Sequence, residues 1–291
     1  MQKLYSETSI SNIADAIRAK GGTGTFTVGE MAQAIEDLPS GGGTDYLAQR
    51  LQNTLTNYSS DEVTNVPASS FINATSVRSM LLPNCTSVGE YAFQGCTGLE
   101  TFSTDKSFTL ARGAFENCTS LVSFPFEKIS KTGLGGGDYI FHNCSSLTGV
   151  YAPQLDRVGL FNASQFNGCT SMVYARFPGI GNNGIRSGVF NNCTALKLAD
   201  LGSTPSIGSA GTIFVNCPNL EILIIRRTSM AAIRSNEFAN TSGVVSVYVP
   251  SALISTYQTG TNWSSLLANN KVQFVALEGS PYEATDFVYN G

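Results

Sequence analysis

The stretch Val88-Gly89-Glu90-Tyr91-Ala92-Phe93-Gln94-Gly95-Cys96-Thr97-Gly98-Leu99 contains the phrase that decides the fold. The phrase is a Phe, two residues that usually end in Asn or Gly, a Cys, two further residues and an apolar residue. It occurs eight times. The complete copies are Phe93/Cys96/Leu99, Phe115/Cys118/Leu121, Phe141/Cys144/Leu147, Phe166/Cys169/Met172, Phe190/Cys193/Leu196 and Phe214/Cys217/Leu220, and degenerate copies stand before them at Phe71/Ala74/Val77 and after them at Phe238/Thr241/Val244.

The spacing of the phrase predicts a stack of similar coils. From Ala74 to Thr241, successive Cys-equivalent positions are 22, 22, 26, 25, 24, 24 and 24 residues apart, within the range of leucine-rich repeats. Apolar residues follow three and five positions after each repeat Leu, as in Leu220/Leu223/Ile225, which predicts one short strand per coil. Because one coil cannot bury its own apolar face, we expect Phe, Cys and Leu to form internal ladders through the stack.

These motifs resemble the BspA-like class of leucine-rich repeats, whose consensus runs Ile-Gly-x-x-Ala-Phe-x-x-Cys-x-x-Leu into a strand that is often followed by Pro. The match covers about residues 58–250. It includes Gly113-Ala114-Phe115 through Leu121, and the prolines after the strands are Pro83, Pro153, Pro178 and Pro250. The resemblance implies an α+β repeat fold, a solenoid with one short strand per coil and helical caps.

The ends of the chain predict separate segments. Helix caps and apolar stripes within residues 9–38 predict a small helical docking module over 1–39, followed by a Gly-rich linker at 40–44. The solenoid spans 45–246 and begins with a cap helix over Tyr46 to Leu55. A C-terminal cap occupies 247–278, with a helix from Ser251, a further turn at 261–267 and a final strand over 272–276. Residues 279–291 form a tail, interpreted as either an assembly strand or a loose end.

The N-terminal segment carries a second resemblance. The residues Ile13-Ala14-Asp15-Ala16-Ile17-Arg18 through Thr27, with Met31-Ala32 and Ile35, look like a short module of phage structural and tail-associated proteins. This resemblance implies attachment of residues 1–38 to a particle or to sister copies.

Composition excludes several classes of function. A net charge of −4 and a pI near 5.1 offer no positive field for nucleic acid, and the pair Arg226 and Arg227 is too small to make one. The first ten residues have no apolar run typical of a secretory signal, and no stretch of about 20 apolar residues occurs in the chain. We therefore expect neither export nor membrane insertion.

The residues that could carry chemistry are better explained by the repeat. Six of the seven cysteines occupy one ladder position, and Ala74 and Thr241 replace Cys there, so we interpret them as reduced core thiols rather than zinc ligands or nucleophiles. Cys85 is expected to be buried too. His142, the single histidine, stands in the turn after a repeat Phe and is interpreted as a solvated or hydrogen-bonded turn residue. The Gly179–Gly184 stretch matches G-x-G-x-x-G but leads into the next repeat rather than a helix. We expect no enzyme, cofactor or metal site.

The outward positions of the strands predict a recognition face. Reading the fourth and second positions after each repeat Leu places Tyr151, Tyr174, Arg176 and Asp200 together, a mixture of aromatic and charged side chains that suits a sugar or a protein epitope. Tyr139, beside the glycine insertion at 133–138, marks a second candidate site. The neighbouring apolar residues of the same columns, Leu198, Ile222 and Ile224, could be covered by another subunit.

Together these observations favour a non-enzymatic component of a bacteriophage virion, associated with the tail or a fibre. It would be assembled in the bacterial cytoplasm, attached to other virion proteins through residues 1–38, and would present the solenoid to a glycan or protein of the host surface. We expect a homo-oligomer, a trimer by analogy with phage appendages. The alternatives are a structural decoration or cement protein of a capsid or tail, and a bacterial surface adhesin.

Overall fold

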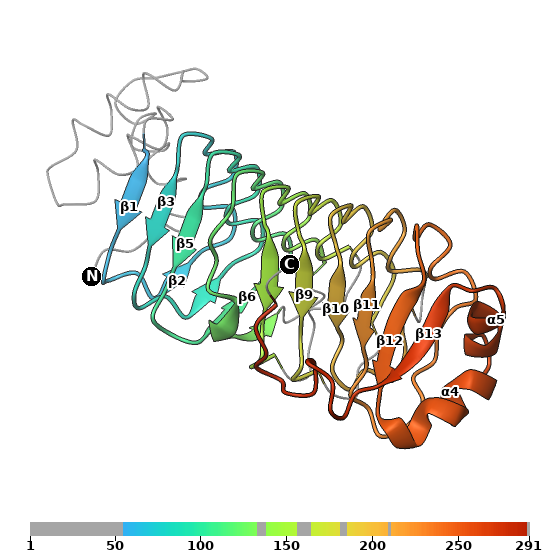
Figure 1. Cartoon of the computed structure of the whole chain (residues 1–291). Coiled ribbons are helices and arrows are strands. Elements are labelled where there is room, and N and C mark those ends of the chain that lie inside the picture. Colours follow the sequence, from blue (N-terminus) through green and yellow to red (C-terminus); the bar gives the residue numbers. More distant parts are fainter. Residues whose placement is uncertain (1–54, 133–137, 156–163, 181–184, 209–210, 290–291) are drawn as a thin grey trace, which may run out of the picture.

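The computed structural model describes residues 55–132, 138–155, 164–180, 185–208 and 211–289. In these ranges the chain winds into a parallel β-solenoid in which each coil stacks on the one before it (Figure 1). The predicted solenoid is confirmed. The predicted module at 1–39, the linker at 40–44 and the N-terminal cap helix lie outside the described residues.

One long face of the solenoid is built from short parallel strands, which we call the strand face. It consists of a three-stranded sheet and a six-stranded sheet. The register places equivalent residues side by side, so Leu198 of one coil pairs with Tyr174 and Ile222 of its neighbours. The outward columns predicted from the sequence therefore exist, with equivalent residues of successive coils side by side. The strands are β1 (Asn57–Ser59), β3 (Ser79–Leu81) and β5 (Thr101–Ser103) in the first sheet, and β8 (Gly149–Tyr151), β9 (Tyr174–Arg176), β10 (Leu198–Asp200), β11 (Ile222–Ile224), β12 (Val245–Val249) and β13 (Val272–Ala276) in the second.

The two sheets are separated at Pro125, where the predicted strand is absent. Only an isolated bridge joins Ser123 to Thr101, and the 3-10 helix η1 (Phe126–Lys128) follows. Proline has no N–H to donate to a ladder, which explains the interruption. The ring of Phe124 instead packs edge-on at 4.9 Å from that of Phe115.

A further sheet, with four strands, lies on another side of the early coils and was not predicted. Its strands β2 (Asn65–Val66), β4 (Ser87–Val88), β6 (Phe108–Leu110) and β7 (Ile129–Thr132) are parallel and adjacent in that order. The expectation of one strand per coil is therefore wrong for this half. Phe108-Thr109-Leu110 alternates buried and half-buried side chains, a period-two pattern that the analysis of the repeat phrase did not include.

Stacked phenylalanine rings form one internal ladder. Successive repeat Phe rings lie with centroids 4.9, 5.0, 5.8, 5.5, 5.9, 5.5 and 6.0 Å apart from Phe71 to Phe238, and no interplanar angle exceeds 22°. All are buried. Ring stacking thus confirms the ladder expected from the repeat.

The cysteine ladder has a polar function that the sequence did not reveal. Each repeat thiol donates a hydrogen bond to the carbonyl oxygen of the repeat Phe one coil earlier, over 2.9–3.2 Å for all six. Phe71 is the first repeat Phe, so Ala74 has no earlier repeat carbonyl to satisfy. Thr241 donates within its own coil, to the Phe238 oxygen at 2.9 Å. All seven cysteines are free and buried, as predicted.

In seven of the eight repeats the second residue after the Phe adopts the left-handed backbone conformation, which explains the preference for Asn or Gly. The second residue after the Phe has φ between 58° and 61° where it is Asn73, Asn117, Asn143, Asn192 or Asn216, and 72° and 80° where it is Gly95 and Gly168. Asn and Gly adopt this region at lower cost than other residues.

The C-terminal cap matches its prediction. After β12 come η2 (Ser251–Leu253), the helices α4 (Ile254–Thr259) and α5 (Trp263–Ala268), and β13, which extends the strand face. The Trp263 indole donates to the Ala231 carbonyl oxygen at 2.7 Å, and the Tyr257 hydroxyl accepts from the Ala231 N–H at 2.9 Å. The cap thereby supplies hydrogen-bond partners for the backbone N–H and carbonyl groups of Ala231 in the last coil. No helix in the described ranges is long and apolar enough to span a bilayer.

Glu237 is a buried carboxyl group with a structural function. One oxygen, Oε1, accepts the backbone N–H groups of Ile213 at 2.6 Å and Phe214 at 3.1 Å. Gln165 occupies the equivalent position three coils earlier and accepts the N–H of Ile140 at 3.3 Å. Burial raises the pKa of Glu237 from 4.5 to about 7.

Replacing Glu237 by Gln should therefore remove a pH dependence of stability. A carboxyl group whose pKa is raised in the fold stabilises it below the unfolded value, near pH 4.5, and this contribution is lost as the pH rises through about 7. We expect Glu237→Gln to be more stable than the parent at pH 8, by at most roughly 3 kcal/mol, and equal to it at pH 4. Urea unfolding at both pH values measures this, with the exposed Glu127→Gln as control. If the difference in free energy of unfolding between variant and parent were the same at pH 4 and pH 8, the raised pKa of Glu237 would be contradicted.

Candidate recognition surfaces

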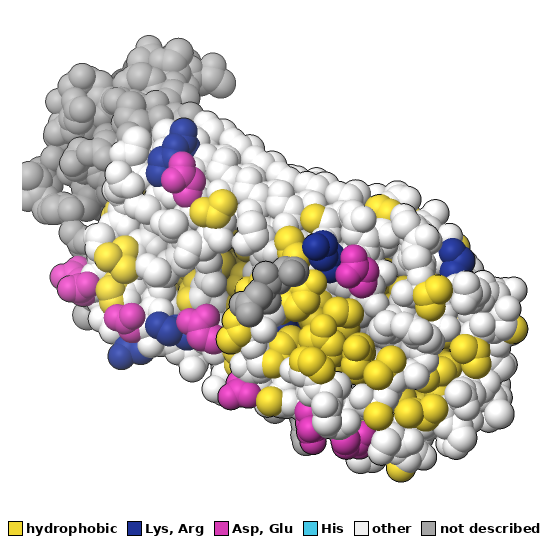
Figure 2. All heavy atoms as spheres, viewed as in Figure 1, with side chains coloured by type: hydrophobic (Ala, Val, Ile, Leu, Met, Phe, Trp, Pro, Cys, Tyr) yellow, Lys and Arg dark blue, Asp and Glu magenta, His cyan; other side chains and the backbone are white. Residues whose placement is uncertain are grey.

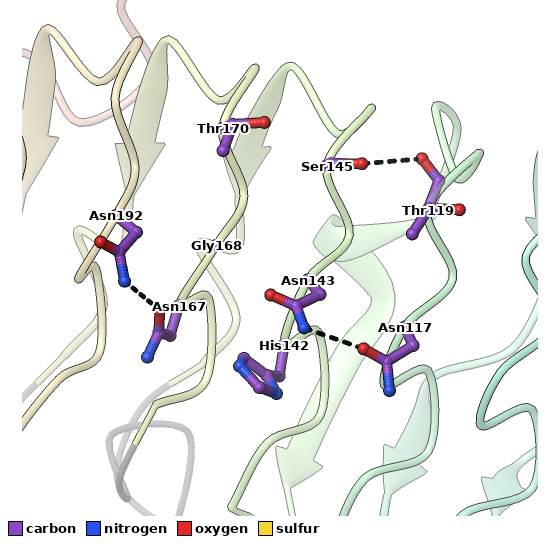
Figure 3. Close-up of a pocket in the computed structure, with 9 residues that line it drawn as sticks. All are labelled: Asn117, Thr119, His142, Asn143, Ser145, Asn167, Gly168, Thr170 and Asn192. Carbon is purple, nitrogen blue, oxygen red and sulfur yellow. Dashed lines mark hydrogen bonds between the residues drawn. The ribbon is translucent and has the colours of Figure 1, made fainter.

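A shallow polar groove crosses the turns of four neighbouring coils, on the side that carries the repeat Asn residues. We call it the turn groove (Figure 3). Its volume is about 610 Å³. Its lining consists of carboxamides, hydroxyls, one glycine and the imidazole: Asn117, Thr119, His142, Asn143, Ser145, Asn167, Gly168, Thr170 and Asn192.

The carboxamides of the turn groove hold one another in place. Asn143 donates from Nδ2 to Oδ1 of Asn117, and Asn192 donates to Oδ1 of Asn167, both at 2.9 Å (Figure 3). A carboxamide has two N–H donors and an oxygen with two lone pairs. These bonds therefore leave each amide with capacity for a further partner, in a position that its neighbour fixes.

His142 forms one end of a short polar chain beside the turn groove. Its Nδ1 lies 3.2 Å from Oε1 of Glu116, whose Oε2 accepts from the Gln94 amide at 2.7 Å. The predicted hydrogen-bonded turn residue is confirmed. The ring of Tyr139 lies 5.6 Å from that of His142, and the Arg112 guanidinium lies 6.0 Å from the centre of the Tyr139 ring. Tyr139 thus stands on the turn side, beside this groove.

On the strand face, the structure brings together the other four predicted residues. Tyr151 pairs with Arg176 across β8 and β9, and Arg176 pairs with Asp200 across β9 and β10. The Arg176 guanidinium lies 4.7 Å above the centre of the Tyr151 ring. The predicted cluster therefore exists, with Tyr174 at the start of β9.

The predicted cluster is not open surface, which corrects the expectation of an exposed face. Only 4% of Arg176 is exposed and Asp200 is completely buried. The cover is the C-terminal segment of the same chain, residues 279–289, which we call the tail and which runs from β13 back across the strand face toward β8 (Figure 1). The tail is thus an intramolecular cover, which neither interpretation of it as an assembly strand or a loose end foresaw.

Apolar side chains of the strand face and the tail form a second, smaller core. Leu198, Ile224 and Leu277 are buried in it, and Tyr174, Ile222, Tyr248, Tyr282, Phe287 and Tyr289 pack around them. Figure 2 shows hydrophobic side chains gathered on this face of the molecule. The apolar residues Leu198, Ile222 and Ile224, for which a covering subunit was one possibility, are therefore covered within the chain.

Arg226 is a central residue of this face that the sequence analysis considered only as a possible nucleic-acid contact. Its side chain makes a two-pronged ion pair with the buried Asp200, with Nη2 at 2.9 Å and Nε at 3.1 Å from Oδ2. It also donates to the carbonyl oxygens of Glu283 at 2.7 Å and Tyr282 at 2.8 Å. The sequence did offer a signal for this ion pair: Arg226 comes just after a strand, and Asp200 is an outward residue of the strand one coil earlier.

The buried thiols are not suited to nucleophilic chemistry. Desolvation by burial raises the pKa of Cys169 and of Cys217 to about 12, and the thiolate is the reactive form. Each of these thiols is committed to a Phe carbonyl oxygen. Within the described part of the chain, no three His, Cys, Asp or Glu side chains gather in a way that could hold a metal ion.

In-register parallel strands, a repeated Phe–Cys–Leu phrase and stacked coils of 22–26 residues define a leucine-rich-repeat solenoid. A model of the BspA type leucine rich repeat region matches residues 52–154 and 135–265, in six copies. The chain belongs to this BspA type leucine-rich repeat family.

Other comparisons add less. A leucine rich cell surface protein from Faecalibacterium prausnitzii is similar over 75% of this chain and 84% of its own, at 15% identity and a TM-score of 0.32. No curated protein sequence matches the chain significantly.

The ion pair of Asp200 gives a stability prediction. Asp200→Ala would leave the Arg226 and Arg176 guanidinium groups together in a largely buried place without their carboxylate, at a cost of about 3–5 kcal/mol. Asp200→Ala combined with Arg226→Met should recover part of this loss, because one uncompensated charge is then removed. Chemical denaturation of both variants tests this. A double variant no more stable than Asp200→Ala would show that the pair does not act as a unit.

Proposed function

We propose that this protein is a non-enzymatic recognition protein whose turn groove binds a glycan on a bacterial surface. The observation that carries the proposal is the turn groove itself: an open, polar depression of about 610 Å³ lined by carboxamides and hydroxyls that their neighbours hold in place. Because sugar hydroxyls both donate and accept hydrogen bonds, a row of carboxamides complements them.

Aromatic rings beside the groove support a sugar ligand. Tyr139 and His142 lie next to each other at one side, and such rings combine an apolar surface with a polar edge. The repeat also places equivalent groups one coil apart along the groove, so a chain of sugar units could meet the same amide and hydroxyl several times. These features favour an extended glycan over a compact small molecule.

The proposal includes the absence of catalysis. Buried titratable side chains of the solenoid serve the fold: the repeat thiols donate to Phe carbonyl oxygens, and Glu237 accepts two backbone N–H groups. A catalytic acid, base or nucleophile needs access to its substrate. We therefore expect bound glycan to remain chemically unchanged.

The proposed setting is a phage virion, in which residues 1–39 attach the protein to the particle. This part of the proposal is supported by the resemblance of residues 13–35 to a module of phage tail-associated proteins. It carries with it assembly in the bacterial cytoplasm and a homo-oligomeric arrangement, a trimer by analogy with phage appendages. A structural decoration protein is the second candidate, favoured by the intramolecular cover on the strand face. A bacterial surface adhesin is the third.

A pair of glycine substitutions tests the turn groove. Asn143→Gly with Asn192→Gly removes two lining carboxamides but keeps the left-handed turns, since Gly95 and Gly168 occupy the same turn position naturally. Labelled protein should bind intact candidate host cells roughly five- to 150-fold more weakly after this change, because the two lost hydrogen bonds are each worth about 0.5–1.5 kcal/mol. Asn73→Gly, at the same turn position but outside the groove, is the matched control.

Two further arms identify the ligand and the dock. Periodate oxidation of the cells should abolish binding of a glycan-specific protein, whereas protease treatment should leave it intact. Deletion of residues 1–43 should spare cell binding and abolish association with particles. Equal binding by the groove variant and the control would refute the groove. Binding to particles alone, with no binding to cells, would favour the decoration role, and shortening of the glycan would refute the non-enzymatic role.

A further inference from the structure

The contact between the tail and the strand face has the form of a peptide in a binding site. Residues 279–289 lie on β8–β12, and arginine side chains of the strand face donate to carbonyl oxygens of the tail backbone. Arg226 binds the oxygens of Tyr282 and Glu283, and Arg176 binds those of Thr285, at 2.9 Å, and Phe287. We call this surface the tail site.

The tail is held by side chains rather than by a strand ladder. The backbone N–H of Ser280 donates to Leu277, just before the tail, and that of Glu283 donates to Ser280 within the tail, so these bonds are local turns and not a ladder with the strand face. Carbonyl oxygens are common to every peptide, so the arginine contacts do not depend on the tail's own sequence. The contacts that do depend on the tail's sequence are made by three half-buried aromatic residues on the strand face: Tyr282, Phe287 and Tyr289. Another peptide with aromatic side chains could therefore take the same place.

The charges of the tail site are not balanced. Two guanidinium groups face one buried carboxylate, Asp200, and Arg226 engages both of its oxygens. Arg176 is 4% exposed and makes no ion pair within the described residues. Its Nε is also a buried donor without a hydrogen-bond partner in that part of the chain. A buried cation whose hydrogen bonds all go to neutral oxygens, and which shares its one nearby carboxylate with a second cation, is incompletely compensated for the water it has lost.

Two aromatic rings lie against the Arg176 guanidinium. The Tyr151 ring centre lies 4.7 Å from it and the Phe287 ring centre 3.5 Å. A guanidinium that stacks on rings still presents its edge, and its edge matches a carboxylate through two parallel hydrogen bonds. The position is occupied by the carbonyl oxygens of Thr285 and Phe287.

We propose that the tail site is a binding site for a peptide of another protein that carries a carboxylate next to an aromatic residue, and that residues 279–289 occupy it as a displaceable substitute. The incoming carboxylate pairs with Arg176, and the aromatic ring replaces that of Phe287. This site is separate from the turn groove, and the proposal does not depend on the glycan function.

A nine-residue peptide supplies a direct probe. It is Gly-Ser-Pro-Tyr-Glu-Ala-Thr-Asp-Phe, residues 279–287 of this chain, ending at Phe287 with a free carboxylate. Because the Phe287 carbonyl oxygen already accepts from Arg176, this terminus places a full negative charge at that point. The same peptide with a C-terminal amide is the matched neutral probe.

The receptor is the full-length chain with a weakened tail, Tyr282→Ser/Phe287→Ser/Tyr289→Ser. This variant keeps every residue of the solenoid and frees the strand face. The control is Val288→Ser, because Val288 is 78% exposed and its change leaves the tail docked. Circular dichroism and thermal unfolding establish that each variant is folded.

Fluorescence anisotropy should show the acid peptide binding the weakened-tail variant at least tenfold more tightly than the amide. Binding to the Val288→Ser control should be much weaker, because the linked tail competes at an effective concentration of about millimolar. Adding Arg176→Gln to the weakened-tail variant should abolish the preference for the acid. Equal affinities for acid and amide, no binding of either peptide by the folded variant, or a preference that survives Arg176→Gln would each overturn the proposal.

Discussion

The structure depends on how one coil rests on the next. Each repeat Phe ring stacks on its neighbours, and from Phe71 to Phe190 the Phe carbonyl oxygen accepts the thiol hydrogen of the Cys one coil later. The same oxygen also accepts a backbone N–H of its own coil, as that of Phe166 does from Cys169. The thiol therefore adds a second hydrogen bond to an interior oxygen, which alanine cannot do. It ties each of these coils to the one before it, and the two outer faces inherit the spacing of the stack.

The two faces obtain different chemistry from the same spacing. On the turn side, the left-handed backbone of seven of the eight repeats admits only a few residue types, and Asn provides both the backbone conformation and a carboxamide row. On the strand side, outward residues are free of that constraint and follow no consensus. Apolar residues therefore collect there beside Arg176 and Arg226, and the tail covers them. The polar face remains open as the apolar one is closed, which assigns the two proposed ligands to separate surfaces.

The covered strand face contains buried charged side chains. Asp200 and Arg226 form an ion pair at the centre of the strand face. The second guanidinium, that of Arg176, is attracted by the Asp200 carboxylate but forms no ion pair with it. Desolvation lowers the pKa of Arg176, and the attraction of Asp200 opposes that shift. Such an arrangement stabilises the fold less than a neutral core would.

The sequence by itself determined the solenoid, its ladders and the C-terminal cap, because a phrase repeated at 22–26 residues permits only stacking of coils. It also placed Tyr151, Tyr174, Arg176 and Asp200 on one face, since period-two alternation fixes which side chains point outward. The second sheet of the early coils and the break at Pro125 lay in segments between the copies of the phrase. Only the tertiary structure decided that the tail returns to cover this face and that Arg226 pairs with Asp200. Those contacts join residues 26 to 134 positions apart with no periodic pattern, and three-dimensional packing alone brings them together.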